Sequence, residues 1–350
     1  MKFKDQTTIP SDDLNAAERK RDHIELAFQS QVETGQLDQR FYYEPLLAAH
    51  PDNNTKSLTF LNKNLQQPIW VSSMTGGTAM AGTINHNLAR ACKDFGMGMG
   101  LGSCRALLTS DDYFEDFNIR PTMGNDLPLY ANLGIAQLEQ VLLSNNIDQV
   151  FRMLDKLQAD GLIIHVNPLQ EWLQPEGDRF TQPPIQTIEQ YLEKTDRPVI
   201  VKEVGQGMGY HSLRALFQLP LQAIDFAANG GTNFARLELL RSDTQKQQIY
   251  GALAQVGHGA EEMVDMTNKI IQQLGERIRC EQVIISGGIQ NFLDGYYLIN
   301  KLKLSCVYGQ ASSFLKYARG DYETLYSYVQ SQVEGLALAN AFLKVKTSEL

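Results

Sequence analysis

Eight short apolar runs recur along the chain, and most are followed by a segment with helical periodicity. The runs do not alternate polar and apolar residues, which is typical of parallel strands covered on both faces. Segments between them, such as 84–96, 135–159, 184–195 and 292–303, place apolar residues every three or four positions, as amphipathic helices do. The predicted strands are 68–73, 98–103, 127–133, 161–167, 198–204, 221–227, 282–288 and 304–310.

This alternation predicts an α/β fold, specifically a (β/α)8 TIM barrel. The strands begin about 22 to 37 residues apart, except for a gap of about 60 residues after the sixth, which we interpret as an insertion. A doubly wound parallel sheet uses the same units and is the alternative. The eight strands, and the absence of a good GxGxxG motif at the first turn, favour the barrel.

Residues 1–67 precede the first strand and form a predicted N-terminal extension, followed by one barrel domain over residues 68–350. Within the extension, ERKRDHIELAF is typical of a short amphipathic helix, with Ile24, Ala27 and Phe28 on one face. The tail from Asp321 onward has a helical pattern, and we expect it to pack against the barrel or a neighbouring subunit.

Charge and cysteine content narrow the class of protein. The 350 residues include 31 Lys and Arg against 40 Asp and Glu, a net charge of −9, so we expect no nucleic-acid partner. The four cysteines form no CxxC pair and indicate neither a zinc site nor a disulfide scaffold. The N-terminus lacks the apolar stretch of a signal peptide, and the longest segment without Asp, Glu, Lys or Arg, residues 64–89, contains polar residues throughout. We therefore expect a cytoplasmic protein with no membrane association.

Small and polar residues crowd the ends of the predicted strands, where a TIM barrel places its active site. Glycine at these exits lets the backbone approach a ligand and expose its N–H groups. Glycines and hydroxyls at the last two exits resemble the phosphate site that barrels often build after strands seven and eight. In any single loop, tight turns would explain the glycines equally well. The exits read SSMTGG, GSCR, ANLG, HVNPLQE, KEVGQG, NGGTNF, SGGIQN and GQASS.

Lys202 follows the apolar residues VIV, within or at the end of a buried strand. An isolated buried ammonium is costly, so a lysine here indicates either a functional group or a structural ion pair, and we favour function. Glu203 should point to the opposite face of the sheet.

The segment after the fourth strand carries Asn167, Gln170 and Glu171 on one short loop. Two amides and a carboxylate are oxygen ligands that suit Mg²⁺, which typically binds one or two carboxylates together with substrate phosphate. Glu171 could instead be a solvated glutamate at the start of a helix.

Arg19, Lys20, Arg21 and His23 form the densest basic cluster of an acidic chain. Most such clusters are solvated surfaces. If the protein binds a diphosphate, this cluster would supply the cations.

Together these motifs resemble those of the type 2 isopentenyl diphosphate isomerases, flavin-dependent enzymes with a (β/α)8 fold. The resemblance runs from about residue 16 to residue 316. SGGI alone occurs in many flavin barrels, whereas RKRDH, HVNPLQE with PEGDR, and VKEVG with GGTNF are much more specific in combination. The matching segments are AERKRDHIELAF, SSMTGGT, INHNLARA, GLGS, ANLG, HVNPLQEWLQPEGDRF, VIVKEVGQGM, NGGTNFARLE, SGGIQNFLD and FLK.

The resemblance implies an isomerase that interconverts isopentenyl diphosphate and dimethylallyl diphosphate in isoprenoid biosynthesis, with no net redox change. It implies reduced FMN, NADPH or NADH as reductant, Mg²⁺, and a homotetramer or homo-octamer. The implied catalytic residues are Lys202, Gln170, His165 and Asn167; the implied substrate contacts are Arg19, Lys20, His23 and Gln170; and Glu171 would hold Mg²⁺. The implied FMN contacts are Met74, Thr75, Gly76, Ser103, Asn132, Lys202, Thr232, Gly287, Gly288, Ile289, Gln290, Ala311 and Ser312.

Two positions depart from that family's pattern. Cys104 and Arg105 stand where glutamine commonly follows GS, and GQASS stands where the family commonly reads GMAG, so that Ser312 takes the phosphate contact. Two other functions stay open: an FMN-dependent 2-hydroxy-acid oxidase or dehydrogenase on the same barrel, and a flavin- or phosphate-binding protein without catalysis. The oxidase needs a His base paired with an Arg clamp, and no convincing pair of that kind occurs late in the sequence.

Overall fold

The computed structural model describes residues 16–51, 57–73 and 79–346. The chain divides between Tyr42 and Tyr43 into two units. The first contains helix α1 (Ala16–Leu26) and the 3-10 turn η1 (Thr34–Gln36), and strand β1 (Phe41–Tyr43) lies at the division. The second contains the barrel.

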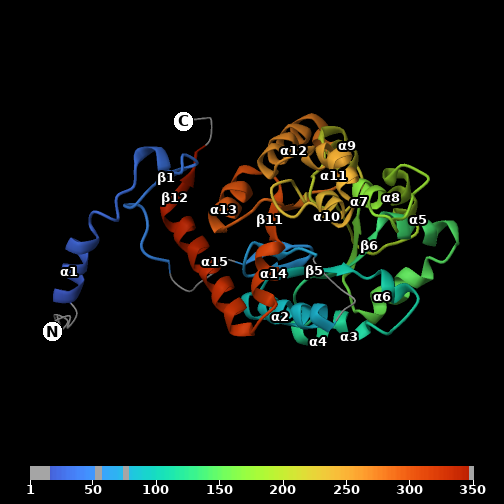
Figure 1. The fold of residues 1–350 in the computed structure, drawn as a ribbon, viewed down its shortest axis with the longest axis horizontal. Helices are drawn as coiled ribbons and strands as arrows, with labels where there is room; N and C mark the ends of the chain where they lie inside the picture. Colours follow the sequence, from blue (N-terminus) through green and yellow to red (C-terminus); the bar gives the residue numbers. More distant parts are fainter. Residues whose placement is uncertain (1–15, 52–56, 74–78, 347–350) are drawn as a thin grey trace, which may run out of the picture. The chain divides into compact units, whose positions relative to one another are not determined.

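A closed barrel of eight parallel strands forms the centre of the second unit (Figure 1). This confirms the predicted (β/α)8 fold, and each predicted strand overlaps one strand of the barrel. β11 closes the ring by pairing with both β10 and β4. The strands are β4 (Ile69–Val71), β5 (Gly98–Ser103), β6 (Leu129–Gly134), β7 (Gly161–His165), β8 (Val199–Lys202), β9 (Ala223–Asp225), β10 (Gln282–Ser286) and β11 (Ser305–Gln310).

The strands are apolar on both faces because helices cover them outside and side chains fill the barrel inside. Every residue of β4, β6, β8 and β9 is buried. The parallel register also places polar residues side by side at the carboxyl ends. His165 pairs with Lys202, and Lys202 pairs with Asp225. The register of three adjacent strands therefore brings His165, Lys202 and Asp225 together at the carboxyl end of the barrel.

Helices follow the strands around the barrel (Figure 1). The helical patterns at 84–96, 184–195 and 292–303 are confirmed, whereas the pattern at 135–159 forms two helices. The break lies at Asn145, whose positive φ of 55° turns the chain out of the helix. The helices are α2 (Ala79–Phe95), α3 (Phe114–Phe117), α4 (Arg120–Met123), α5 (Ile135–Leu143), α6 (Asp148–Lys156), α7 (Pro168–Leu173), α8 (Pro184–Leu192), α9 (Tyr210–Leu216), α13 (Phe292–Lys301) and α14 (Ser312–Ala318), with the 3-10 turn η2 (Arg105–Leu108).

The predicted insertion after the sixth strand is confirmed. Between β9 and β10 the chain forms more helix than one β–α unit needs. These elements are α10 (Phe234–Arg241), α11 (Thr244–Tyr250), η3 (Gly251–Gln255), α12 (Ala260–Leu274) and η4 (Gly275–Arg277).

The tail forms α15 (Tyr322–Phe342) and the short strand β12 (Leu343–Val345). Asp321 caps the helix by accepting the Thr324 N–H at 2.9 Å. α15 packs against α2, α13 and α14, so the prediction that the tail packs on the barrel is confirmed. Gly335 permits this approach, because a Cβ there would lie 2.5 Å from the Phe292 ring.

A hairpin of β2 (Leu58–Phe60) and β3 (Lys63–Leu65) lies at the amino ends of the barrel strands. The Leu61 N–H donates to Gln282 Oε1 at 2.9 Å, and Lys63 Nζ lies 2.6 Å from Asp160 Oδ1. Gln282 begins β10 and Asp160 immediately precedes β7. The hairpin therefore covers the end of the barrel opposite the predicted site.

The prediction for the N-terminal helix needs one correction. α1 ends at Leu26, so Ala27 and Phe28 follow the helix and do not share a face with Ile24. Ile24 and Phe28 are 73% and 82% exposed, so these side chains form no buried apolar face.

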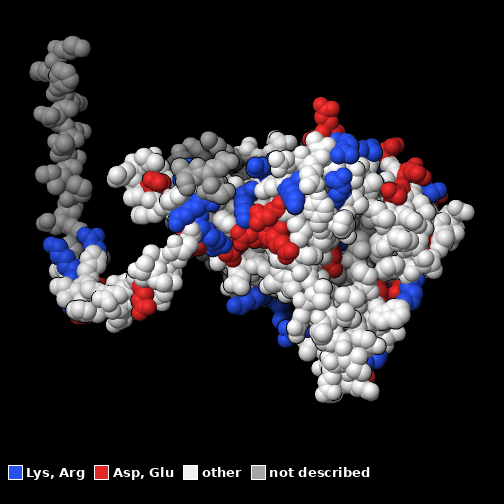
Figure 2. Space-filling view, turned by 90° about the horizontal axis from the view of Figure 1, so that it is seen from above, with Lys and Arg blue, Asp and Glu red and all other residues white. Residues whose placement is uncertain are grey.

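Charged side chains of both signs are interspersed on the face of the barrel shown in Figure 2. Within the described segments, no helix combines the length and apolar character that a membrane crossing requires.

Candidate functional site

A cavity of about 180 Å³ lies at the carboxyl ends of β4, β8, β9, β10 and β11, where TIM barrels bind their ligands. The residues on its wall come from the ends of these five strands and from the segments that follow them. Eight of the predicted FMN contacts are among them: Lys202, Thr232, Gly287, Gly288, Ile289, Gln290, Ala311 and Ser312.

The other predicted FMN contacts lie elsewhere. Met74, Thr75 and Gly76 fall outside the described residues. Ser103 and Asn132 pair with each other at the ends of β5 and β6 and do not line this cavity. Asn132 instead contacts His165.

Two glycines show that main chain forms the wall of the cavity. Gly287 has a φ of +93°, and a Cβ there would lie 2.0 Å from the Ala228 carbonyl oxygen. Gly205 has a φ of +120°, and a Cβ there would lie 2.1 Å from the Thr232 carbonyl oxygen. Only glycine readily adopts this conformation, and only glycine fits this close contact between loops.

Two serines at the end of β4 leave polar atoms without partners in the cavity. The Ser72 and Ser73 hydroxyls are buried, and neither has a hydrogen-bond partner within the described part of the chain. Leaving a buried polar group unpaired costs about 1–3 kcal/mol. This pair therefore indicates a ligand with polar atoms.

Lys202 reaches the cavity from the end of β8 and is buried. Its Nζ donates to the carbonyl oxygen of Glu203 at 2.7 Å. On the next strand, Asp225 is fully buried, and Ser286 Oγ donates to its Oδ1 at 2.5 Å. Burial raises the pKa of the Asp225 carboxyl, and the positive charge of Lys202 opposes that rise. The predicted functional lysine thus has a buried carboxyl group as its neighbour.

His165 is held at the end of β7 by Asn132. Its Nδ1 lies 2.8 Å from Asn132 Oδ1, while Asn132 Nδ2 donates to the Leu101 carbonyl oxygen at 3.0 Å. Burial and, to a smaller extent, the positive charge of Lys202 together lower the pKa of His165 from 6.5 to about 3. The imidazole is therefore neutral near pH 7.

Asn167, Gln170 and Glu171 lie together at the start of α7, as predicted. Asn167 Nδ2 donates to Gln170 Oε1 at 3.1 Å and to Glu171 Oε1 at 3.0 Å. The Asp178 N–H donates to Glu171 Oε2 at 2.7 Å. Glu171 is buried, so the interpretation as a solvated helix-start glutamate is wrong. Asn167 Oδ1 is buried and has no hydrogen-bond partner among the described residues.

The residues that replace the family's glutamine have separate roles. Cys104 is fully buried, and burial raises its thiol pKa to about 12, so it is a core residue. Arg105 Nη1 lies 2.7 Å from Asp178 Oδ2, which also accepts from Gln137 Nε2 at 2.6 Å. Arg105 therefore anchors the loop whose backbone holds Glu171.

The structure also explains what Gln310 does in the GQASS segment, which differs from the family's common GMAG. Gln310 is buried on the cavity wall, where its Nε2 contacts the Ile289 carbonyl oxygen and its Oε1 accepts from Tyr328 OH at 3.2 Å. It thus connects the last two strand exits to α15. The Gln290 N–H already donates to Asp294 Oδ2 at 3.0 Å, within the cap of α13.

Arg19, Lys20 and His23 all lie exposed on α1, in the first unit. Their role in substrate binding stays a prediction.

Sequence reasoning missed Ser72, Ser73, Asp225, Ser286 and Gln310 as parts of the site. Asp225 carried the clearest available signal, since it is an acidic residue inside an apolar strand adjacent to the strand of Lys202. The serines and glutamine gave no comparable signal, because such residues are common at strand ends.

Curated relatives match nearly the whole chain. A protein of Rickettsia peacockii (strain Rustic) named isopentenyl-diphosphate delta-isomerase is 33% identical over 326 residues, covering 92% of each chain. A protein of the same name from Rickettsia felis is 34% identical over 325 residues, covering 92% of this chain and 91% of its own. The chain belongs to the isopentenyl-diphosphate delta-isomerase family. No protein-family model matches it.

Solved structures outside the isopentenyl-diphosphate delta-isomerase family share its fold. A mandelate oxidase mutant with a monooxide FMN adduct has a TM-score of 0.53 at 14% identity, covering 88% of this chain and 89% of its own. The flavin-binding domain of baker's yeast flavocytochrome b2 has a TM-score of 0.58 at 12% identity, covering 86% of this chain and 71% of its own. At this identity the likeness is one of fold alone.

Proposed function

We propose that this protein interconverts isopentenyl diphosphate and dimethylallyl diphosphate. The names and coverage of its relatives support this activity. The structural observation that carries the proposal is the position of Lys202. Its side chain lines a glycine-rich cavity, and His165 lies beside it on the adjacent strand. This arrangement supplies a positive charge and a neutral imidazole at one end of the barrel.

The residues of the cavity fit FMN. Main-chain walls at Gly205 and Gly287 leave space that side chains would fill, and the Ser72 and Ser73 hydroxyls have no hydrogen-bond partner among the residues that the structure describes. We infer that the wall residues named above hold the cofactor, with Ala311 and Ser312 near its phosphate. When bound in the reduced form, FMN would supply an electron-rich ring and an exchangeable proton. NADPH or NADH would be the reductant.

Lys202 would contribute by electrostatics. A buried ammonium stabilises negative charge in a cavity that excludes water, which would favour anionic reduced flavin. Its hydrogen bond to the Glu203 carbonyl fixes where that charge lies. Lys202 therefore serves both cofactor binding and the reaction in this account.

The residues at the start of α7 fit Mg²⁺. Glu171 supplies one carboxylate, and the unpartnered Asn167 Oδ1 supplies a neutral oxygen beside it. The described residues contain no cluster of three His, Cys, Asp or Glu side chains that could hold a metal ion. A site with few protein ligands suits Mg²⁺, because water and substrate phosphate complete the coordination of this ion.

The reaction moves a double bond by adding a proton at one carbon and removing a proton from another, with no net oxidation. His165, Asn167 and Gln170 would orient the substrate at the carboxyl end of β7. Holding a flexible substrate in reactive geometry can lower the barrier substantially. Neutral His165 adds no positive charge where a carbocation-like state would form.

The basic cluster on α1 would bind the diphosphate. Replacing Arg19 and Lys20 together with glutamine should raise the KM for isopentenyl diphosphate. Replacing Lys269 and Lys303 together with glutamine is the matched control, because both lysines are exposed and lie outside the cluster. Equal KM values in the two variants would remove the cluster from substrate binding.

We also propose a homotetramer or homo-octamer in the cytoplasm. Cys92, Cys104, Cys280 and Cys306 are free thiols, which supports a reducing compartment.

Anaerobic incubation with isopentenyl diphosphate, dithionite-reduced FMN and Mg²⁺, followed by product analysis, tests the proposed activity. Dimethylallyl diphosphate should form until the two isomers reach equilibrium. A fully loaded enzyme that forms none would overturn the proposal.

A further inference from the structure

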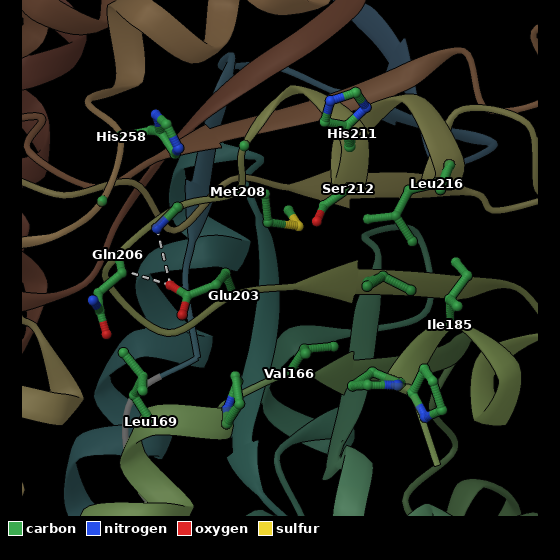
Figure 3. A pocket seen from close by; sticks show the side chains of 18 of the residues that line it. Val166, Leu169, Ile185, Glu203, Gln206, Met208, His211, Ser212, Leu216 and His258 are labelled. Atoms are coloured by element: carbon green, nitrogen blue, oxygen red, sulfur yellow. Dashed lines mark hydrogen bonds between the residues drawn. The ribbon is translucent and has the colours of Figure 1, made fainter. Parts of the chain in front are cut away.

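A second and larger cavity is lined by Val201 and Glu203, the two neighbours of Lys202 in the sequence, but not by Lys202 itself. Figure 3 shows this cavity with Glu203 on its wall. Its volume is about 610 Å³, within the range of about 300–1,000 Å³ typical of small-molecule sites. Helices α8 and α9 flank it, and residues 256–258 close one side. It shares no lining residue with the flavin cavity.

The walls of this cavity are predominantly apolar. Val166, Leu169, Ile185, Met208 and Leu216 supply side chains, as Figure 3 shows. Two consecutive prolines add apolar surface that has no N–H donor. The cavity therefore suits a ligand with a hydrocarbon body.

Glu203 places a carboxyl group on this otherwise predominantly apolar wall. It is 9% exposed, and its Oε2 accepts from the N–H groups of Gly205, Gln206 and Gly207 at 2.6–3.0 Å. Burial raises the pKa of the Glu203 carboxyl, against the lowering effects of these bonds and of Lys202. Among the described residues that line the cavity there is no Lys or Arg. A buried carboxylate is stabilised by a cation, and no described residue of this cavity's lining supplies one.

A second acceptor lies at the rim. His258 Nδ1 is 3.0 Å from Glu262 Oε1, an oxygen that accepts, so Nδ1 donates there and Nε2 is the nitrogen left for a ligand. A Cβ on Gly209 would lie 3.2 Å from that Nε2, which places it at the cavity edge. A donor-rich cation matches both acceptors.

The wall that carries these acceptors is fixed by hydrogen bonds. Gln206 Nε2 donates to the Val256 carbonyl oxygen at 2.6 Å, and the His258 N–H donates to the Gln206 carbonyl oxygen at 2.8 Å. The loop after β8 and residues 256–258 therefore form one preformed wall. A preformed site loses less affinity to ordering on binding.

We propose that this cavity is a second ligand site, which binds a small primary amine with an apolar body. The ammonium pairs with Glu203 and reaches His258, while the hydrocarbon packs against the apolar side chains. Charge-assisted hydrogen bonds in a desolvated site give the ammonium its advantage over a neutral group of equal size. The site shares no lining residue with the flavin cavity and does not depend on the activity proposed above.

Benzylamine is the probe, and benzyl alcohol is its neutral counterpart. Binding to the FMN-loaded full chain is measured by ligand-observed NMR, with and without saturating isopentenyl diphosphate and Mg²⁺. Benzylamine should bind at least tenfold more tightly than the alcohol, and the diphosphate should leave its Kd unchanged. Absence of benzylamine binding, equal affinity for the two probes, or displacement by the diphosphate would overturn the proposal.

Variants locate the site. Ser212 lies on α9 at the cavity, so Ser212→Phe should fill it and weaken benzylamine binding at least tenfold. Ser327→Phe, at an exposed serine of α15, is the control and should bind like wild type. Glu203→Gln should abolish the preference for the amine over the alcohol. Circular dichroism checks that each variant folds, and unchanged benzylamine affinity in folded Ser212→Phe contradicts the assignment.

Discussion

His165 Nδ1 lies 2.8 Å from Asn132 Oδ1, and this contact determines which nitrogen of the imidazole carries the proton. Asn132 Nδ2 is already committed to the Leu101 carbonyl oxygen, so its Oδ1 must face the ring. Nδ1–H therefore donates, and Nε2 is left as an acceptor at the end of β7. Two adjacent strands thus set the tautomer of a residue that neighbours Lys202.

The low pKa of His165 makes stability depend on pH in a defined window. The folded state has a pKa of about 3 against 6.5 ordinarily, so between these values the unfolded chain binds a proton that the folded chain does not. This contribution to stability is fully present above about pH 6.5 and is lost as the pH falls toward 3. The free energy of unfolding of wild type minus that of His165→Gln should rise with pH across the window and level off above it. Urea unfolding at several pH values measures this difference; a constant difference would contradict the lowered pKa.

Asn132→Asp tests the same contact from the other side. A carboxylate beside Nδ1 favours the imidazolium, so the pKa of His165 should rise by a unit or more, as about 1–3 units is typical for an adjacent opposite charge. NMR titration of the ring measures it. An unchanged titration would show that Asn132 does not control the protonation of His165.

Lys202→Ala should lower isomerase activity by about 10²- to 10³-fold, the usual effect of removing one preorganised electrostatic group. FMN affinity should weaken as well, because Lys202 lines the flavin cavity. Turnover with saturating reduced FMN separates the two effects. Lys303→Ala removes an exposed lysine and is the control. Wild-type turnover in Lys202→Ala would exclude this residue from the mechanism.

Glu171→Gln should raise the Mg²⁺ concentration needed for half-maximal activity by about 10-fold or more, as loss of a metal-site carboxylate typically does. The amide keeps the shape of the side chain but loses its charge. Glu176→Gln changes an exposed glutamate of the following loop, which pairs with Arg241 at 3.0 Å, and should leave the titration unaltered. Superimposable Mg²⁺ titrations for the two variants would rule out ligation by Glu171.

Gly287→Ala should abolish tight FMN binding while leaving the barrel folded. The added Cβ would lie 2.0 Å from the Ala228 carbonyl oxygen at a φ of +93°, so the loop after β10 must move. Backbone strain of this kind costs about 1–3 kcal/mol. Gly320→Ala, where a Cβ meets nothing within 4 Å, is the control. Flavin fluorescence titration compares them, and wild-type affinity in Gly287→Ala would show that this turn does not form the cradle.

The fold could be predicted because buried parallel strands produce continuous apolar runs, and β4 to β11 each appear as one. The break at Asn145 was harder to predict, since apolar periodicity continues on both sides of the turn. The end of α1 before Ala27 was missed because an exposed helix has no packing requirement to mark its boundary.

The site was predictable only where a residue is unusual in its context. Lys202 interrupts an apolar strand, and Glu171 follows two amides, so both could be identified from sequence. Asp225 lies beside Lys202 because of the register between β8 and β9. Arg105 contributes through its contact with Asp178. Neither of these pairings can be predicted from one sequence. The second, larger cavity depends on how α8 and α9 pack, which periodicity does not specify.

The ratio of NADPH consumed to dimethylallyl diphosphate formed tests the central claim most directly. Both quantities are measured anaerobically in one reaction with FMN-loaded protein, isopentenyl diphosphate and Mg²⁺. If bound reduced flavin serves proton transfer without net oxidation, many product molecules should form for each NADPH oxidised. One NADPH consumed per product, or full activity from protein stripped of flavin, would contradict the account.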